Sequence, residues 1–184
     1  MSDARIVTTA VERLEAFANT DLHDLADAAE AAIADGGGFG WIDAPPRHIM
    51  ESYWRGVLLV PGRELFVARL DGTICGSAQL VRPPRNNEAQ AFAAQMMHNF
   101  MAPWARGHGL ARRLVVAVED AARAAGFAIL NLDVRDTQAA AIQLYETLGY
   151  IRWGTHPAYA RIGTAVVPGH YYYKRLQPDD QVGR

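Results

Sequence analysis

Hydrophobic positions along the chain follow two different spacings, which separate the expected strands from the expected helices. Alternation of apolar and polar residues predicts strands over residues 64–70 and 73–81, because successive side chains of a strand face opposite sides of a sheet. The Asp71-Gly72 pair between these two runs is a strong hairpin signal. The run 91–101 is largely apolar on both faces, which predicts a strand that is central in its sheet.

Apolar residues three and four positions apart predict helices elsewhere in the chain. Gly126 and Gly149 follow the last apolar positions of the two later helices and are expected to end them. Asp136 or Thr137 is expected to cap the start of the last helix. The expected helices cover residues 11–34 with a break near 19–20, the segment from the Pro45-Pro46 pair to 55–56, and residues 110–125 and 138–148.

Further strands are expected over residues 5–9, 128–134, 150–153 and 170–176. Because strands and helices alternate in the second half of the chain, the predicted fold class is α/β with a mixed sheet. The length of 184 residues suits one domain with a single core. We expect this domain over residues 1–176, followed by a frayed tail over 177–184.

Composition narrows the classes of function. Half of the residues are hydrophobic and the net charge is −2, without a long basic run, so nucleic acid is not expected as the main partner. No apolar run approaches the roughly 18–20 residues of a membrane span, and the N-terminus has no signal-peptide pattern, so a cytoplasmic protein is expected. Cys75 lies in a strand pattern without a nearby base and is expected to pack in the core. No metal is expected, because no His, Cys and Asp cluster has ligand spacing.

Between the central strand and the 110–125 helix stands the sequence Arg106-Gly107-His108-Gly109-Leu110-Ala111. A glycine-containing turn that opens a helix points the first backbone N–H groups at one spot, and the helix dipole makes this end positive. Glycine lacks a Cβ, so the oxygen atoms of an anion can approach the backbone closely. The segment therefore predicts an anion site that fits a pyrophosphate, with Arg106 adding a charge at its rim.

The turn by itself leaves alternatives open. An ordinary strand-to-helix turn also contains glycine. No Gly-Lys-Ser/Thr follows, which excludes a P-loop, and Arg112 stands at the third glycine position of the dinucleotide fingerprint. Arg112 and Arg113 are either solvated helix residues or partners of a bound phosphate.

A second segment makes the assignment specific. The stretch 100–111, which contains Arg106, Gly109 and Ala111 in the spacing Arg-x-x-Gly-x-Ala, resembles the acetyl-coenzyme A motif of the GNAT superfamily of N-acetyltransferases. Residues 132–150 are similar to the other hallmark of this superfamily, in which a strand leads to a helix Ala-Ile-x-Leu-Tyr-Glu that ends in Leu-Gly-Tyr. The resemblance implies a single mixed, mostly antiparallel sheet with a splayed central strand pair and helices on both faces.

The resemblance also implies the site of acetyl-CoA, the cosubstrate. The pantetheine arm is expected to pair with the strand at Phe100 and Met101, like an extra strand. Gln138 stands where the family usually has an Asn that holds the pantetheine, so it keeps the amide on a longer arm. The pyrophosphate is expected at backbone N–H groups of the turn and first helical residues, with the binding set Arg106, Gly107, His108, Gly109, Leu110, Ala111 and Arg112.

Three residues are candidates for catalysis. Tyr145 corresponds to the general acid of the family, which protonates the departing thiolate; by position alone, Tyr145 packs on the sheet beside Leu148. Asp133 corresponds to a carboxylate that serves as base in some protein N-terminal acetyltransferases of the family. His98 is the other candidate base, because an imidazole titrates in the right range. Both also have a structural interpretation, as a hydrogen-bonding residue and as a strand histidine.

The expected function is therefore transfer of acetyl from acetyl-CoA directly to a primary amine of a small molecule, in a ternary complex. The alternatives are an acyl-CoA-binding sensor or scaffold without turnover, and nucleotide binding at the same turn. Dimers are frequent in the family, which leaves a homodimer open.

The acceptor is expected to contact residues 30–60 and 155–170, whose aromatic residues hint at a small, partly apolar molecule. The glycine-rich loop 36–41 is either an inter-helix connector with buried rings or a loop over the substrate cleft. This loop and the segments 154–159 and 170–176 also partly resemble the tabtoxin-resistance type of acetyltransferase.

Overall fold

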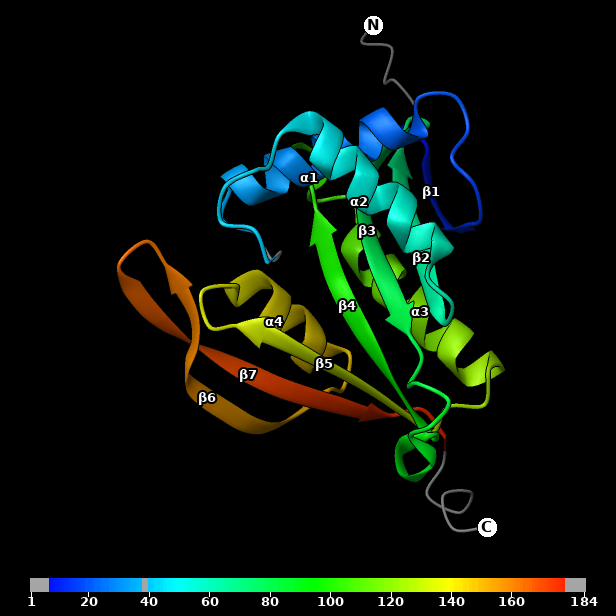
Figure 1. The fold of residues 1–184 in the computed structure, drawn as a ribbon, viewed down its shortest axis with the longest axis vertical. Helices are drawn as coiled ribbons and strands as arrows, with labels where there is room; N and C mark the ends of the chain where they lie inside the picture. Colours follow the sequence, from blue (N-terminus) through cyan, green and yellow to red (C-terminus); the bar gives the residue numbers. More distant parts are fainter. Residues whose placement is uncertain (1–6, 38–39, 178–184) are drawn as a thin grey trace, which may run out of the picture.

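Seven strands form one sheet in the order β1-β2-β3-β4-β5-β7-β6 (Figure 1). The structure is a computed structural model that describes residues 7–37 and 40–177. Short 3-10 turns precede β4 and follow it, at Glu88–Gln90 and Pro103–Ala105. The strands are β1 Thr9–Leu14, β2 Arg63–Leu70, β3 Thr73–Val81, β4 Ala93–Met101, β5 Ile129–Arg135, β6 Ile151–Ile162 and β7 Ala165–Arg175.

The sheet is mixed and mostly antiparallel, as expected. Strands β4 and β5 are its one parallel pair among the described residues, and every other neighbouring pair is antiparallel. The β2–β3 hairpin turns at Asp71 and Gly72, both with positive φ, as the sequence predicts.

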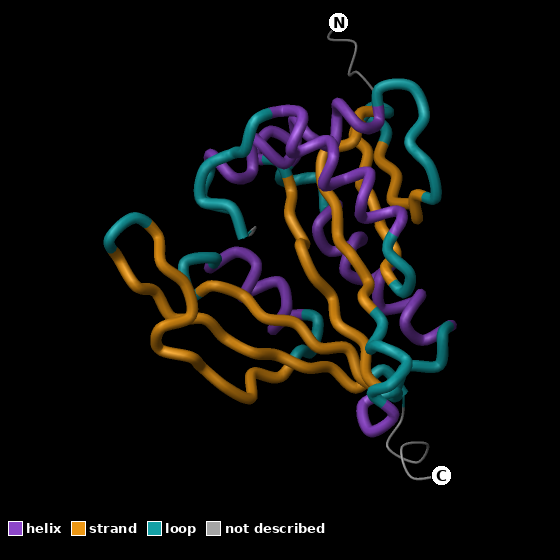
Figure 2. Tube along the Cα trace, in the orientation of Figure 1, coloured by secondary structure: helices purple, strands orange, loops and turns teal. Residues whose placement is uncertain are grey.

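The two central strands separate after a short contact. Pairing between β4 and β5 covers three residues on each strand, with Ala93 opposite Ile129 and Gln95 opposite Asn131. Beyond this point the two strands diverge, which Figure 2 shows as a V that opens toward the helices. The remaining length of β4 therefore does not pair with β5.

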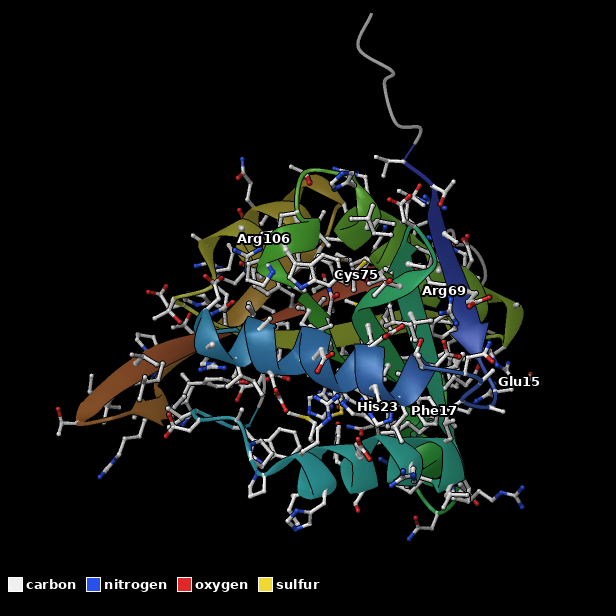
Figure 3. The ribbon with its side chains drawn as sticks, turned by 90° about the horizontal axis from the view of Figure 1, so that it is seen from above. Glu15, Phe17, His23, Arg69, Cys75 and Arg106 are labelled. Carbon is white, nitrogen blue, oxygen red and sulfur yellow. The ribbon has the colours of Figure 1, made fainter. Side chains whose placement is uncertain are left out.

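Helices cover both faces of the sheet and enclose two apolar cores (Figure 3). One core lies under α1 (Asp21–Ala34) and α2 (Arg47–Leu59) and contains the fully buried Trp54. The other lies under α3 (Leu110–Ala124) and α4 (Ala139–Thr147). Within the described residues, no helix is long and apolar enough to cross a membrane.

A β-bulge in β4 changes which core its residues enter. Met97 is opposite Gln79 of β3 and Phe100 is opposite Ser77, so β4 carries one extra residue at this place. His98 at the bulge has a positive φ of 49°. As a result Met96 packs in the α3–α4 core and Phe100 in the α1–α2 core, although residues four apart in a regular strand share a face.

The N-terminal prediction is wrong at its start. Residues 9–14 form β1, whereas the sequence predicts a helix from residue 11. The helix-forming residues Glu12 and Arg13 pair with β2 instead, through ion pairs to Arg69 and Glu64, so tertiary contacts override local propensity. The break expected near residues 19–20 is where α1 begins. The strand expected over 5–9 has its first two residues outside the described residues.

The C-terminal hairpin is longer than predicted. Strands β6 and β7 span 12 and 11 residues, whereas the sequence predicts strands over 150–153 and 170–176. Glycine and proline residues interrupt the alternating pattern here, and the ladder accommodates them through register shifts near Gly154 and Pro157. Helix α2 also continues past Gly56 to Leu59. Most of the expected tail, 178–184, lies outside the described residues.

Trp54 and Trp153 form a matched pair for testing this core. Trp54 is 0% exposed and lies against Phe100 with ring centroids 6.2 Å apart, whereas Trp153 is 65% exposed. We expect Trp54→Ala to lower the free energy of unfolding by about 3–5 kcal/mol, because it leaves a large cavity. Trp153→Ala should lower it by less than about 1 kcal/mol. Urea titrations of both variants measure the difference, and equal losses would contradict the described core.

Candidate active site

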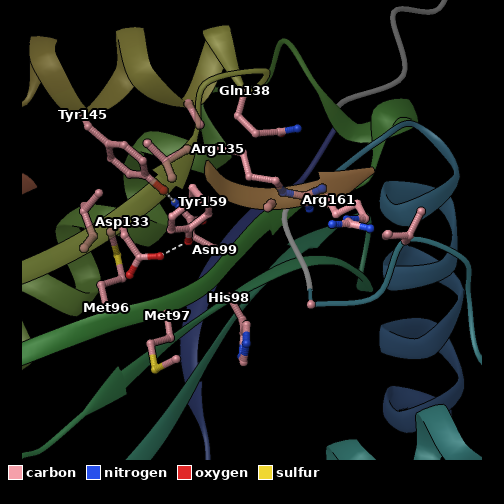
Figure 4. A pocket seen from close by; sticks show the side chains of 16 residues that line it. Met96, Met97, His98, Asn99, Asp133, Arg135, Gln138, Tyr145, Tyr159 and Arg161 are labelled. Carbon is pink, nitrogen blue, oxygen red and sulfur yellow. Dashed lines mark hydrogen bonds between the residues drawn. The ribbon is translucent and has the colours of Figure 1, made fainter. Parts of the chain in front are cut away.

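The gap between β4 and β5 opens into two neighbouring cavities. One has a volume of about 480 Å³ and lies between β4, β5 and the β6–β7 hairpin (Figure 4). The other is a groove of about 580 Å³ between the end of α1, the turn before α3 and the start of α4. Asn99, Gln138 and Ala141 line both cavities, so the two spaces meet at these residues. We call them the acceptor cavity and the turn groove.

The turn groove contains the glycine turn singled out in the sequence. Gly107 and Gly109 have φ values of 84° and 70°, a backbone conformation that favours glycine. Gly109 is the N-cap of the 15-residue helix α3, so the positive end of the helix dipole faces the groove. The groove is also lined by Phe100, Met101, Arg106, Leu110, Ala111 and Arg112.

His108 stays a predicted member of the binding set through its backbone N–H, and its imidazole has a separate role. His108 does not line the groove, because its Nδ1 atom is within hydrogen-bond distance of the carbonyl oxygens of Ala105 and Arg106, at 3.1 and 3.0 Å. Its imidazole therefore stabilises the turn. Of the two following arginines, Arg112 donates to the Thr147 hydroxyl at 3.0 Å and Arg113 donates to the Thr9 hydroxyl at 2.7 Å.

Three contacts hold the segment after α1 against the groove. Arg106 pairs with Asp35 at 2.6 Å. Gln138 donates to the Gly36 carbonyl at 2.6 Å, and Arg135 donates to the Gly37 carbonyl at 2.7 Å. The amide of Gln138 is thus engaged with the chain itself, while its side chain still lines both cavities. Of the 36–41 loop expected near the substrate, Gly40 lines the acceptor cavity, and residues 38–39 lie outside the described residues.

Tyr145 lines the acceptor cavity beside a residue that both cavities share. Helix α4 places it there, and its Oη atom accepts a hydrogen bond of 3.1 Å from Asn99, which lines both spaces. Burial raises the pKa of Tyr145 to about 12, against a smaller lowering effect of the Asn99 bond. The phenol therefore keeps its proton at neutral pH. Its ring also packs in the α3–α4 core together with Leu148, as the structural interpretation predicts.

Asp133 projects from β5 into the acceptor cavity. Gln95 donates to its Oδ1 atom at 3.2 Å, and the Tyr159 hydroxyl donates to Oδ2. A carboxylate has about four lone-pair sites, so Asp133 can accept further bonds from a ligand. Burial, then the bond to Asp133, raises the pKa of Tyr159 above its ordinary value.

Tyr159 reaches Asp133 because the hairpin is irregular. Between His156 and Ala160 the register of β6 against β7 shifts, so β6 carries extra residues there. The Tyr159 ring then lies over Gly169, where an added Cβ would clash with the ring. Pro157, which cannot donate to a ladder, was the one sequence signal for this bulge.

His98 is directed away from Tyr145, toward α2 (Figure 4). Its Nδ1 atom lies 2.8 Å from the Tyr53 hydroxyl. The side-chain amide nitrogen of Gln79 donates to that hydroxyl at 3.2 Å. Arg63 in turn donates to the side-chain amide oxygen Oε1 of Gln79 at 3.1 Å. Because Arg63 can only donate, the amide oxygen of Gln79 accepts and its NH2 group donates to Tyr53. The Tyr53 hydroxyl then has its proton free to donate to His98 Nδ1. Burial, followed by the charge of Arg63, lowers the pKa of His98.

Several residues of the acceptor cavity were not found by sequence reasoning. Asn99, Arg135 and Arg161 line it, and no local motif marked them. The cysteine behaves as predicted: Cys75 is buried, its thiol donates to the Ala68 carbonyl at 3.3 Å, and burial raises its pKa to about 11. A thiol in this state is not a nucleophile at neutral pH.

Comparison with known proteins identifies the class to which this fold and these cavities belong. The model of the acetyltransferase (GNAT) family matches residues 21–150, so the chain belongs to this family. It is 66% identical, over 70% of its length and 76% of the relative's, to an uncharacterized N-acetyltransferase encoded in the hisH-hisA intergenic region of Azospirillum brasilense. The superfamily resemblance seen in the sequence is confirmed, and the tabtoxin-resistance resemblance stays a prediction.

Solved structures show the same fold. The chain superposes on an N-acetyltransferase from Staphylococcus aureus with a TM-score of 0.79 and 16% identity, covering 92% of this chain and 99% of that one. It superposes on yncA from Salmonella typhimurium, solved with its cofactor acetyl-CoA, with a TM-score of 0.74 and 16% identity, covering 92% and 94%. The predicted GNAT fold is therefore confirmed.

Gly169 and Gly154 allow a test of the hairpin geometry. An added Cβ at Gly169 meets the Tyr159 ring, whereas nothing lies within 4 Å of one at Gly154. We expect Gly169→Ala to displace the ring and break the Tyr159–Asp133 bond, with a loss of about 1–3 kcal/mol in the free energy of unfolding from overpacking. Crystal structures and urea titrations of both variants check this, with Gly154→Ala as the control. A Gly169→Ala structure that keeps the bond would refute the account.

Proposed function

We propose that the protein transfers the acetyl group of acetyl-CoA directly to the primary amine of a small molecule, within a ternary complex. The observation that supports this most is the position of Tyr145, a buried and protonated phenol that lines the acceptor cavity and is bonded to Asn99, which lines both cavities. Apart from His108, the predicted site residues of the two motifs line one cavity or the other.

The turn groove fits acetyl-CoA. Backbone N–H groups at the start of α3 suit its pyrophosphate, with Arg106 and Arg112 nearby as cations. The edge of β4 that faces β5, at Phe100 and Met101, suits the amide groups of the pantetheine arm, which add to a strand edge as another strand does. When bound there, acetyl-CoA supplies the activated acetyl thioester.

Tyr145 has the role of general acid in this proposal. Its Oη atom holds a proton that can be donated to the departing sulfur, and Asn99 fixes the direction of the phenol through its hydrogen bond. The surrounding core excludes water from the ring, which is 4% exposed. The same burial that raises the pKa of Tyr145 keeps this proton in place until the thiolate forms.

Asp133 is the residue that we propose to receive the proton of the amine. Its carboxylate faces the acceptor cavity, and its charge attracts the ammonium form of an acceptor to the side where Tyr145 lies. His98 also lines the acceptor cavity, but its Nδ1 atom is engaged by Tyr53 of α2, so we assign it the role of positioning the bulged strand.

Tyr145→Phe tests the acid. We expect kcat to fall by about a hundredfold to ten-thousandfold, because the only atom lost is the donor oxygen, while the affinity for acetyl-CoA stays close to that of the parent. Thiol release with an amine library and calorimetric titration of acetyl-CoA measure the two quantities. Tyr173→Phe, which removes a hydroxyl on β7 that lines neither cavity, is the control. Binding without thiol release in parent and variant alike would favour the sensor.

Asp133→Asn and His98→Gln separate the two candidate bases. We expect Asp133→Asn to lower kcat/KM by about a hundredfold, because the amide cannot take a proton. His98→Gln should cost less than about tenfold, since the imidazole contacts Tyr53 rather than the reacting groups. Steady-state kinetics of both variants decide the matter, and a larger loss for His98→Gln would reverse the assignment.

A further inference from the structure

The charges of the acceptor cavity indicate which amines it takes. We propose that the acceptor is an amino acid with an apolar side chain, and that Arg161 binds its carboxylate. This inference rests on the proposed function and deepens it, because it names the class of acceptor for the same site.

Opposite charges stand at different sides of the cavity. Asp133 and Tyr145 lie on one side, whereas Arg135 and Arg161 lie on the other (Figure 4). A simple amine or a polyamine enters as a cation, and two guanidinium groups disfavour it. A zwitterion matches both sides, since its ammonium group faces Asp133 and its carboxylate faces the arginines. This arrangement also places the amine near Tyr145, the proposed general acid of the transfer.

The two arginines differ in their engagement. Arg135 donates to the Gly37 carbonyl at 2.7 Å, so it holds the segment after α1 while adding positive charge to the cavity. Arg161 has no hydrogen-bond or ion-pair partner among the residues described, although arginines such as Arg69 and Arg82 are paired with carboxylates. Its planar fork of N–H donors suits a carboxylate in a bidentate bond.

The hairpin bulge explains why Arg161 stands over the cavity. Arg161 follows Tyr159 by two residues in β6, and both side chains line the cavity together with Ala160. The bulge that carries Tyr159 to Asp133 therefore also carries Arg161 to the opposite rim. The same irregular segment of β6 thus supplies Tyr159, which contacts Asp133, and Arg161, which faces the carboxylate of the acceptor.

The rest of the lining fixes the size and polarity of the acceptor. A volume of about 480 Å³ is near the lower end of small-molecule sites, which span roughly 300–1,000 Å³. Part of the wall is apolar, so an apolar side chain can be buried against it. This part consists of Ile42, Met96, Met97, Leu132, Val134 and Ala141.

The experiment compares acids with matched amides. The full chain is assayed with acetyl-CoA and L-methionine, L-phenylalanine, their carboxamides, 2-phenylethylamine, spermidine and a short peptide, with mass detection of the products. Loss of the charge-assisted bond costs about tenfold or more in binding. We therefore expect kcat/KM for the free amino acids to exceed that for their carboxamides by about that factor.

Variants of Arg161 assign the effect to this residue. Arg161→Gln should lower the ratio of acid to carboxamide by about tenfold, and Arg161→Lys should restore part of it, because lysine keeps the charge but not the fork. Arg85→Gln is the matched control: it removes the same charge from an exposed loop position that lines neither cavity. Its acid-to-carboxamide ratio should equal that of the parent.

The outcomes separate this inference from the proposed function. Carboxamides, 2-phenylethylamine, spermidine or the peptide used as well as the acids would overturn the amino-acid class while leaving acetyl transfer intact. So would an Arg161→Gln variant that loses acid and carboxamide activity in equal measure. Failure to bind acetyl-CoA, or binding without acetylation of any amine, would overturn the proposed function and this inference together.

Discussion

The short pairing of β4 with β5 is the constraint on which the rest of the site depends. Three residues on each strand hold the two halves of the sheet together, and beyond them the backbones diverge. A continuous ladder would leave no free edge on β4 and no space between the strands. Because the contact ends at Gln95 and Asn131, groups from α4, from β5 and from the C-terminal hairpin can meet there.

Two irregular strands then aim side chains at this space. In β4 the extra residue at His98 sends Asn99 to the side of Tyr145 and Phe100 to the opposite core. In β6 the extra residues before Ala160 send Tyr159 to Asp133. In a regular strand, successive side chains face opposite sides of the sheet in strict alternation, which would direct these side chains elsewhere. The site is thus built from departures from ideal geometry, held by regular elements on either side.

Features that depend on residues close together in the chain could be predicted from the sequence. Gly126 and Gly149 both adopt positive φ just after α3 and α4, so those helices end within two residues of the predicted positions. The turn with Gly107 and Gly109 lines a groove, and Tyr145 lies beside it, as the two motifs imply. These features depend on residues close together in the chain, which explains why a single sequence revealed them.

Features that depend on contacts between distant segments could not be predicted from the sequence. Glu12 and Arg13 favour a helix locally and form a strand because β2 offers them partners. Tyr159 and Arg161 line the cavity from an irregular hairpin, and the Tyr159 ring occupies the space over Gly169, ten residues away. The contact of the His108 ring with the carbonyl groups of the turn was likewise not predicted.

The burial of Cys75 has a practical consequence for work with thiol cofactors. It is the one cysteine of the chain, and its sulfur is enclosed beneath the sheet with a proton that it gives up only in strongly alkaline solution. The folded protein therefore contributes no background to colorimetric sulfhydryl reagents. The buried thiol is likewise protected from mixed-disulfide formation with oxidised coenzyme A.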